Sequence, residues 1–248
     1  MIYKLIDTSK AEALFAGWEE TLIWSCLQQV MGEIYVTSLE EPRCAMARVG
    51  DFAFFTGEPD KELVLGKPKG FLIMTPQNEA WAALIEECFP KAEKVIRYAI
   101  KKNAKFQKDK LEKMVASLPD GYEIRKIDGE LYDLCLPEPD FMDFVSVFGS
   151  KEKFLELGRG MVVLKDGRIV AGASSYTRYK EGIEVEVDTL EEERGKGLAS
   201  AVSAALILAC LEEGLYPSWD AANMISVHLA EKLGYEFSHE YICYFYSD

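Results

Sequence analysis

The sequence predicts an α/β protein in two parts, a smaller α/β domain over residues 1–118 and a second α/β domain over residues 119–248. Helix-like and strand-like segments alternate along the whole chain. Of the 248 residues, 49% are apolar and 28% are charged, which is an ordinary globular mixture. A turn-forming stretch, Ser117-Leu-Pro-Asp-Gly121, leaves a length on either side that suffices for a modest core.

The composition argues against several classes of protein. A formal charge of −14 is opposite to the basic face that a nucleic-acid-binding protein needs. There is no apolar run long enough to span a bilayer and no apolar signal core near the first residue, so we expect a cytoplasmic protein without membrane contact. Six cysteines without a CxxC pair, and only two histidines, favour reduced thiols and no metal site.

The first half reads as a helix, a run of strands, a second helix and a further strand. Apolar residues at helical spacing predict one amphipathic helix over Lys10–Met31, and glycine-rich turns separate the short apolar runs that follow it. The expected later elements are strands at Glu33–Thr37, Arg43–Val49, Asp51–Thr56 and Phe71–Thr75, a helix at Asn78–Cys88, and a strand at Val95–Ile100.

A basic segment closes the first half. Residues 91–113 hold nine basic and three acidic residues, a net of +6, so the rest of the chain carries −20. We interpret the segment as a solvated helix face leading into a linker. A nucleic-acid-binding role for it is the alternative, and the −20 elsewhere disfavours that role.

The second half is predicted to begin with a strand at Tyr122–Ile127 and an irregular, partly helical stretch at Leu131–Leu157. Asp166-Gly167 between two apolar runs, Met161–Lys165 and Ile169–Tyr176, is a strong hairpin signal. Next comes a strand over Gly182–Thr189 with strict alternation. One face carries Ile183, Val185, Val187 and Thr189, and the other carries Glu184, Glu186 and Asp188.

A glycine-containing loop then joins this strand to a helix expected over Ser200–Glu213. The loop reads Arg194-Gly195-Lys196-Gly197-Leu198-Ala199. Unpaired N–H groups and the positive end of the helix dipole meet at such a junction, and glycines let the backbone approach an anion closely. The segment therefore predicts a phosphate or pyrophosphate site. It matches neither the P-loop nor the dinucleotide-binding GxGxxG pattern.

The pattern Arg194-x-x-Gly197-x-Ala199 after such a strand resembles motif A of the GCN5-related N-acetyltransferases (GNAT). Trp219–Tyr235 resembles their motif B, with Asn223 as N-cap and Gly234 as C′ of a helix over 224–233, and Glu236–Tyr246 would supply the last strands. The resemblance covers Tyr122–Asp248, and the two-part layout is similar to a bacterial GNAT family with relatives among antibiotic self-resistance acetyltransferases. It implies a mixed, mostly antiparallel, splayed sheet with flanking helices. The first half could be a degenerate GNAT-like domain.

The resemblance also assigns roles to residues. It implies that acetyl-CoA is the co-substrate and that its acetyl group passes directly to an amine. The strand would offer backbone groups at Val187, Asp188 and Thr189 to the pantetheine arm. The residues implied for the pyrophosphate, mainly through their backbone N–H groups, are Arg194, Gly195, Lys196, Gly197, Leu198 and Ala199. Asn223 and Ser226 would face the pantetheine arm.

The catalytic groups are open to more than one assignment. A carboxylate on the 182–189 strand can deprotonate the amine, and Glu186 is the first choice from its spacing to Arg194, with Glu184 and Asp188 on the same face. Ala230 stands where many relatives have a tyrosine that protonates the thiolate of CoA, so Tyr241, Tyr244 or water would have to serve. The acidic chain favours a cationic small-molecule acceptor. The other function considered is a non-catalytic acyl-CoA-binding or regulatory module.

Overall fold

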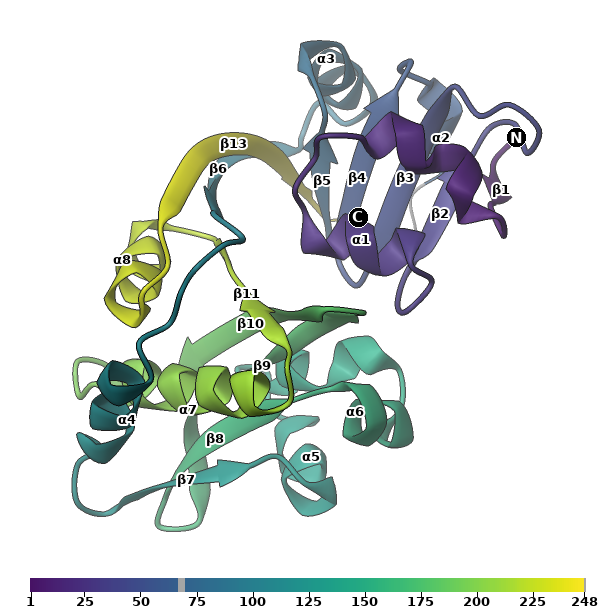
Figure 1. Cartoon of the computed structure of the whole chain (residues 1–248). Helices are drawn as coiled ribbons and strands as arrows, with labels where there is room; N and C mark the ends of the chain where they lie inside the picture. The colour runs from purple at the N-terminus through teal and green to yellow at the C-terminus, as the bar shows by residue number, and fades with distance from the viewer. Residues whose placement is uncertain (67–69, 248) are drawn as a thin grey trace. The chain divides into compact units, whose positions relative to one another are not determined.

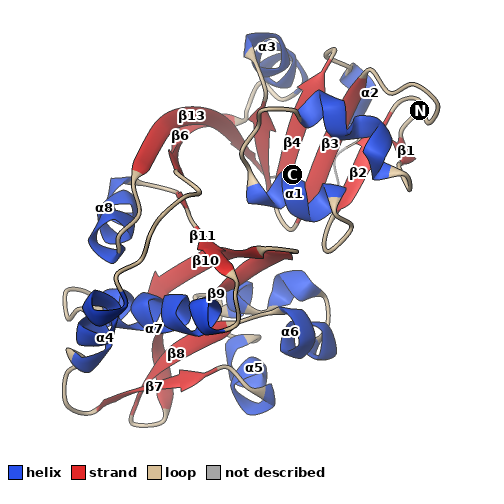
Figure 2. Ribbon diagram, in the orientation of Figure 1, coloured by secondary structure: helices blue, strands red, loops and turns tan. Residues whose placement is uncertain are grey.

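The computed structural model describes residues 1–66 and 70–247 and confirms the α/β fold (Figures 1 and 2). By its packing the chain forms two compact units. Unit 1 comprises Met1–Arg97 together with the chain from Glu240 on, and unit 2 comprises Tyr98–His239. No helix within the described residues is both long enough and apolar enough to cross a membrane.

Unit 1 is a sheet with helices on both faces. The strand order of this sheet is β1-β2-β3-β4-β5-β13-β6-β12, with β4 and β5 parallel and the other pairings from β1 to β13 antiparallel. Its last strand, β12 (Asp220–Ala221), pairs with Tyr98 and Ala99 of β6, and these residues belong to unit 2. The elements of unit 1 are β1 (Tyr3–Lys4), the 3-10 helix η1 (Thr8–Phe15), α1 (Thr21–Leu27), β2 (Glu33–Val36), β3 (Cys44–Val49), β4 (Phe52–Gly57), α2 (Lys61–Leu65), β5 (Leu72–Pro76), α3 (Glu79–Cys88), and the larger parts of β6 (Glu93–Ile100) and β13 (Phe237–Tyr246), which both continue into unit 2.

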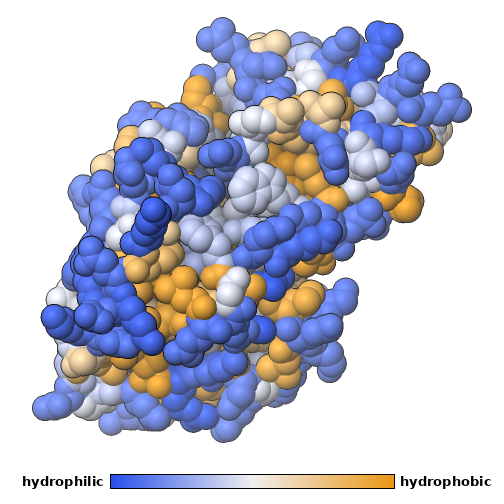
Figure 3. All heavy atoms as spheres, in the orientation of Figure 1, coloured by the Kyte–Doolittle hydropathy of each residue, from blue (hydrophilic) through white to orange (hydrophobic). Residues whose placement is uncertain are grey.

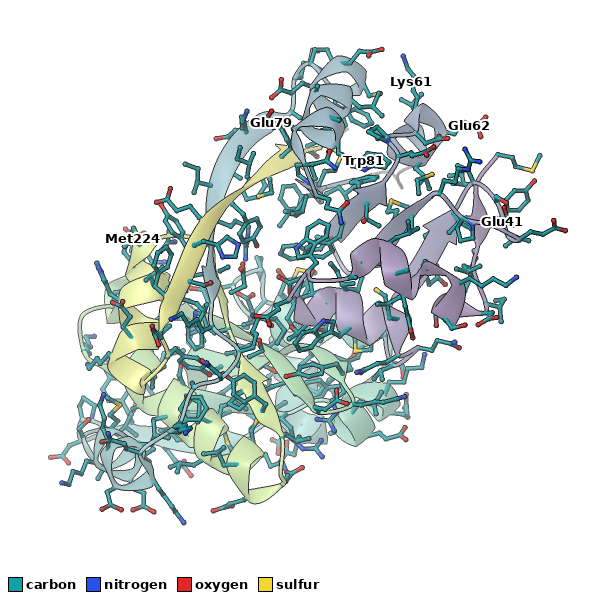
Figure 4. The ribbon with its side chains drawn as sticks, turned by 45° about the horizontal axis from the view of Figure 1, so that its top comes forward. Glu41, Lys61, Glu62, Glu79, Trp81 and Met224 are labelled. Atoms are coloured by element: carbon teal, nitrogen blue, oxygen red, sulfur yellow. The ribbon has the colours of Figure 1, made fainter. Side chains whose placement is uncertain are left out.

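Alternation along β4 gives unit 1 a core on each side of its sheet. Phe54 meets Trp18 on one face, with ring centroids 5.7 Å apart. Phe55 meets Trp81 of α3 on the other face, at 5.4 Å. Trp81 is fully buried and points from α3 toward the sheet (Figure 4), and its indole N–H donates to the Gly57 carbonyl at 2.9 Å. Successive strand residues thus pack on opposite faces of the sheet.

The single helix predicted over Lys10–Met31 is wrong, because the segment contains two short helices with a break between them. Gly17 adopts a φ of 78°, which ends the first helical segment in the left-handed region. Glu20 then caps α1, its side chain accepting from the Leu22 N–H at 3.3 Å. The apolar periodicity continues through the break and therefore conceals it.

Unit 2 contains a five-stranded sheet in the order β11-β10-β9-β8-β7, antiparallel except for the β10–β11 pair. The predicted hairpin, the 182–189 strand and the 224–233 helix are all confirmed. The elements are α4 (Lys108–Ala116), β7 (Tyr122–Lys126), α5 (Gly129–Cys135), η2 (Met142–Phe144), η3 (Ser146–Phe148), α6 (Lys151–Leu157), β8 (Gly160–Lys165), β9 (Arg168–Tyr179), β10 (Gly182–Thr189), η4 (Glu191–Glu193), α7 (Leu198–Glu212), β11 (Tyr216–Ser218), β12 (Asp220–Ala221) and α8 (Met224–Leu233).

Helix α7 is the central helix of unit 2. It is apolar almost all round, packing against β8, β9 and β10 on one side and against α4 on another. Leu111 of α4 is fully buried, whereas Leu211 near the end of α7 is 41% exposed. Apolar side chains accordingly reach the surface in the region of α7 (Figure 3). The helical part of the basic segment is therefore packed on α7 through its one buried leucine.

The domain boundary predicted at 118/119 lies within unit 2. It stays a prediction that the chain near this position is a linker accessible to proteases. Limited proteolysis tests it. Since α4 packs on α7, we expect early cleavage on either side of α4, in residues 101–107 and 117–121, while α4 itself resists. Mass spectrometry of the first fragments locates the cuts, and first cuts inside α4 would contradict the expectation.

Candidate acetyl-CoA site

The second half of β10 has an open edge. The strand pairs with β9 along its whole length, but β11 pairs with it only from Gly182 to Glu184. The Leu190 N–H donates to the Val170 carbonyl of β9 at 3.0 Å. Because backbone groups alternate in direction along an antiparallel pair, Val187 and Thr189 turn their N–H and C=O groups to the open edge. The splay predicted from the sequence is thus present.

The side chain of Arg194 occupies the open edge of β10 at its C-terminal end. Its Nε donates to the Thr189 carbonyl at 3.2 Å, and its guanidinium lies 4.0 Å from Asp188 Oδ1. The Thr189 N–H donates to the same Asp188 oxygen at 2.6 Å. Burial raises the pKa of Asp188, against the opposing effects of that N–H and of Arg194. These contacts occupy the N–H and C=O of Thr189, so Val187 provides the remaining backbone groups of the open edge.

The loop before α7 presents backbone N–H groups. Gly195 and Gly197 have φ values of 77° and 83°, the left-handed region that favours glycine, and open space surrounds both positions where a Cβ would lie. Gly197 is the N-cap of α7 and provides no side-chain cap, so the first N–H groups of the helix, from Leu198 to Ser200, are left for a ligand. An anion placed there would meet backbone donors and the positive end of a fifteen-residue helix.

Lys196, expected to meet the pyrophosphate mainly through its backbone, turns its side chain toward Glu193. Its ammonium donates to Glu193 Oε2 at 2.6 Å and to the Glu192 carbonyl at 3.2 Å. Glu193 is only 7% exposed, and its bonds to Lys196, Tyr122 and Lys165 lower the pKa of its carboxyl to about 2. The sequence offered no sign that one glutamate of the 191–193 run would be buried.

The three acidic residues of β10 share one face, as the alternation predicts, but their surroundings differ. Glu184 is 4% exposed, and one of its oxygens lies 3.9 Å from Nζ of Lys102, whose side chain is 9% exposed. Lys102 also donates to the Trp219 carbonyl at 3.1 Å. Glu186 and Asp188 are half-buried. Along the strand, the first carboxylate is thus buried beside a lysine, and the next two are partly accessible.

Sequence reasoning missed the polar groups around Glu184. Thr177 of β9 and Ser218 of β11 stand directly opposite it in the register, and both hydroxyls are buried without a hydrogen-bond partner in the described chain. Lys102 comes from the basic segment interpreted as a linker. Only strand pairing brings these groups together, and none of them belongs to a recognisable sequence motif.

In the motif B region the predicted residues have structural partners. The Asn223 side chain caps α8 by accepting from the Ser226 N–H at 3.0 Å, and Ser226 Oγ accepts from the Trp219 indole at 3.0 Å. Lys232 donates to Ser200 Oγ of α7 at 3.1 Å. Ala230 is fully buried. Tyr241 and Tyr244, considered as proton donors, belong to unit 1, where their partners include Arg97 and Glu86 respectively.

Comparison with known proteins shows the family. A model of the family described as GNAT acetyltransferase matches residues 12–244, and the chain belongs to this family. A crystal structure of a GCN5-related N-acetyltransferase-like protein from Streptococcus suis 89/1591 is 45% identical, with a TM-score of 0.92 over 96% of this chain and 97% of that one. The fold class expected from the resemblance is therefore confirmed.

Two further relatives are more distant. An uncharacterized N-acetyltransferase, YdfB, from Bacillus subtilis (strain 168) is 33% identical over 141 residues, 54% of this chain. The chain spans about half the length of this curated relative, 51%. A putative GNAT-family acetyltransferase from Novosphingobium aromaticivorans DSM 12444 shares the fold at a TM-score of 0.54 and 16% identity, covering 90% of this chain and 95% of that one.

The cap on α8 leads to a stability prediction. Replacing Asn223 with Ala removes the acceptor of the Ser226 N–H, so the free energy of unfolding should fall by about 1 kcal/mol. Asn223→Asp keeps an acceptor and should remain near the parent protein. Urea denaturation followed by circular dichroism measures both variants. Equal loss in the two would show that the amide has a role other than capping.

Proposed function

We propose that the protein transfers the acetyl group of acetyl-CoA to an amine in a ternary complex. The observation that carries this proposal is the open edge of β10 leading into the Gly195–Ala199 loop at the start of α7. The loop and first turn of α7 would bind the pyrophosphate through backbone N–H groups. Val187 at the open edge would hydrogen-bond the pantetheine arm, with Asp188 and Thr189 shaping the end of that edge.

The chemistry requires that the amine be neutral, because an ammonium has no lone pair. Its nitrogen attacks the thioester carbon, the C–N bond forms, the C–S bond breaks, and the thiolate of CoA takes up a proton. The proton lost by the amine passes to a carboxylate of the acidic face of β10. Glu186 is our choice, since it is half-buried on that face while Glu184 is buried against Lys102.

The acceptor in this proposal is a cationic small-molecule amine. A formal charge of −14 raises the local concentration of cations and opposes polyanions such as nucleic acids. All six cysteines have free thiols, five of them buried, which suits a reducing compartment such as the cytoplasm.

One observation favours a second function, that of an acyl-CoA-binding module without turnover. Ala230, at the position where many relatives carry a proton-donating tyrosine, is fully buried and has no hydroxyl to give. Incubation of the protein with acetyl-CoA and a panel of primary amines, with CoA release followed by a thiol reagent, separates the two. Amine-dependent release supports the transferase, and binding without release supports the module.

Gly197 should be essential for acetyl-CoA binding. We expect the parent protein to bind with a micromolar Kd, of order −8 kcal/mol. Gly197→Asp forces a side chain into a φ of 83° and sets a negative charge beside the pyrophosphate, so affinity should fall by roughly 100-fold or more. Calorimetry measures it.

The matched control is Gly167→Asp in the β8–β9 turn, where φ is 76° and the surroundings are equally open. It introduces the same backbone strain and charge away from the proposed ligand. Equal affinity in parent and Gly197→Asp, or equal loss in both variants, would remove the loop from the site.

Glu186→Gln tests the base. The change keeps the shape of the side chain and removes its charge, so kcat/KM should drop by roughly 10²–10⁴-fold with the best amine of the panel. Acetyl-CoA affinity should stay near that of the parent. The defect should shrink as pH rises toward the pKa of the amine, because the acceptor then arrives neutral.

Glu123→Gln, an exposed change on β7, is the control for Glu186. If Glu186→Gln retains full activity at pH 7, the same measurement on Glu184→Gln and Asp188→Asn assigns the base. Full activity in all three variants would contradict a carboxylate base on β10.

A further inference from the structure

Glu193 lies immediately before the loop proposed to bind pyrophosphate. It ends η4, and the two acidic residues before it, Glu191 and Glu192, are exposed, whereas Glu193 is 7% exposed. A buried carboxylate is unfavourable unless hydrogen bonds and opposite charges compensate it. The neighbours of Glu193 provide that compensation.

Three donors converge on this one carboxylate. The Tyr122 hydroxyl of β7 donates to Oε2 at 2.5 Å, Lys165 at the end of β8 donates to Oε1 at 2.9 Å, and Lys196 of the loop donates to Oε2 at 2.6 Å. Tyr122 and Lys165 are themselves paired across β7 and β8, with the ammonium 5.2 Å from the ring centre. Glu193 therefore connects the loop to a rigid pair of strands.

Arg194 donates to the Thr189 carbonyl and lies near Asp188, and the loop after it, from Gly195 to Gly197, is exposed. A Cβ added at Gly195 or Gly197 would meet open space, and all four residues from Arg194 to Gly197 are exposed. The C-terminal end of the loop is fixed by Leu198, which is 1% exposed. On its N-terminal side the Glu193 contacts provide the corresponding anchor.

We infer that Glu193 is a positioning residue for the pyrophosphate loop, and that Lys196 braces the loop through Glu193 instead of contacting the pyrophosphate. This inference rests on the proposed function, because it concerns the loop that would bind acetyl-CoA. It assigns the anion entirely to backbone N–H groups. It gives the side chain of Lys196 a supporting role in the loop.

The alternative role for Lys196 makes an opposite prediction. If its ammonium moved to the pyrophosphate when acetyl-CoA binds, Glu193 would compete with the ligand for it. Removing the carboxylate charge would then release a cation and tighten binding. In a brace, removing either partner loosens the loop and weakens binding, and removing both does little more damage than removing one.

The experiment measures acetyl-CoA affinity by calorimetry for the full chain and for Glu193→Gln, Lys196→Met and the double variant. Each single change should weaken binding by roughly 10-fold, the scale of one hydrogen bond to a charged group. The double variant should lie within about 2-fold of the weaker single one. Tighter or unchanged binding by Glu193→Gln overturns the inference, as does unchanged binding by Lys196→Met.

Controls separate positioning from general damage. Asp133→Asn breaks an exposed ion pair with Lys151, at 2.6 Å in the same unit, and should leave affinity unchanged. S-acetylpantetheine lacks the pyrophosphate, so its affinity should also be unchanged in Glu193→Gln, whereas a merely structural defect weakens both ligands. Equal weakening of the two ligands therefore counts against the positioning role.

Two further variants keep the test decisive if Glu193→Gln does not fold. Tyr122→Phe and Lys165→Met each remove one donor from the far side of the carboxylate without changing the loop, and each should weaken acetyl-CoA binding by roughly 3-fold or more. Unchanged affinity in both overturns the inference. If the parent protein itself binds no acetyl-CoA, the proposed function fails first and the inference with it.

Discussion

The point where β10 and β11 part is the constraint on which the candidate site depends. At the root of the pair, a Cβ on Gly182 would lie 2.0 Å from the Tyr216 carbonyl and 2.6 Å from the Tyr179 hydroxyl, so only glycine lets the strands meet there. Pro217 brings no N–H to the ladder, and its carbonyl accepts from Tyr235 at 2.6 Å. Pairing ends at Ser218, and the rest of β10 keeps an edge to which a ligand can add its own hydrogen bonds.

Two buried carboxylates flank the open-edged part of β10. Glu184 lies at the last paired position with Lys102, and Glu193 follows the strand with Lys165 and Lys196. Each is compensated by lysine, as buried acids in proteins generally must be. In a chain of net charge −14, these lysines thus have structural partners close to where an anionic ligand would bind. In the proposed site the anion is bound by backbone N–H groups, whose dipoles need no counter-charge of their own.

Local patterns predicted much of the fold and part of the site. Strict alternation gave the limits of β10, Asp166-Gly167 gave the β8–β9 turn, and Asn223 with Gly234 gave both ends of α8. Prediction failed where a signal was overridden or absent. Helical periodicity ran through the break at Gly17, and β11 is three residues long with a proline inside it, too short and irregular to be recognised.

The sequence by itself determined the glycine loop, the strand before it and the helix after it, because turn chemistry, period and caps act between residues close in the chain. The tertiary structure alone decided which charged side chains are buried and held in ion pairs. Lys102 reaches Glu184 across 82 positions, Tyr122 reaches Glu193 across 71, and Thr177 and Ser218 flank Glu184 through strand register. Burial depends on these distant neighbours, and it distinguishes the buried Glu184 from the half-buried Glu186 although both are glutamates on one face of the same strand.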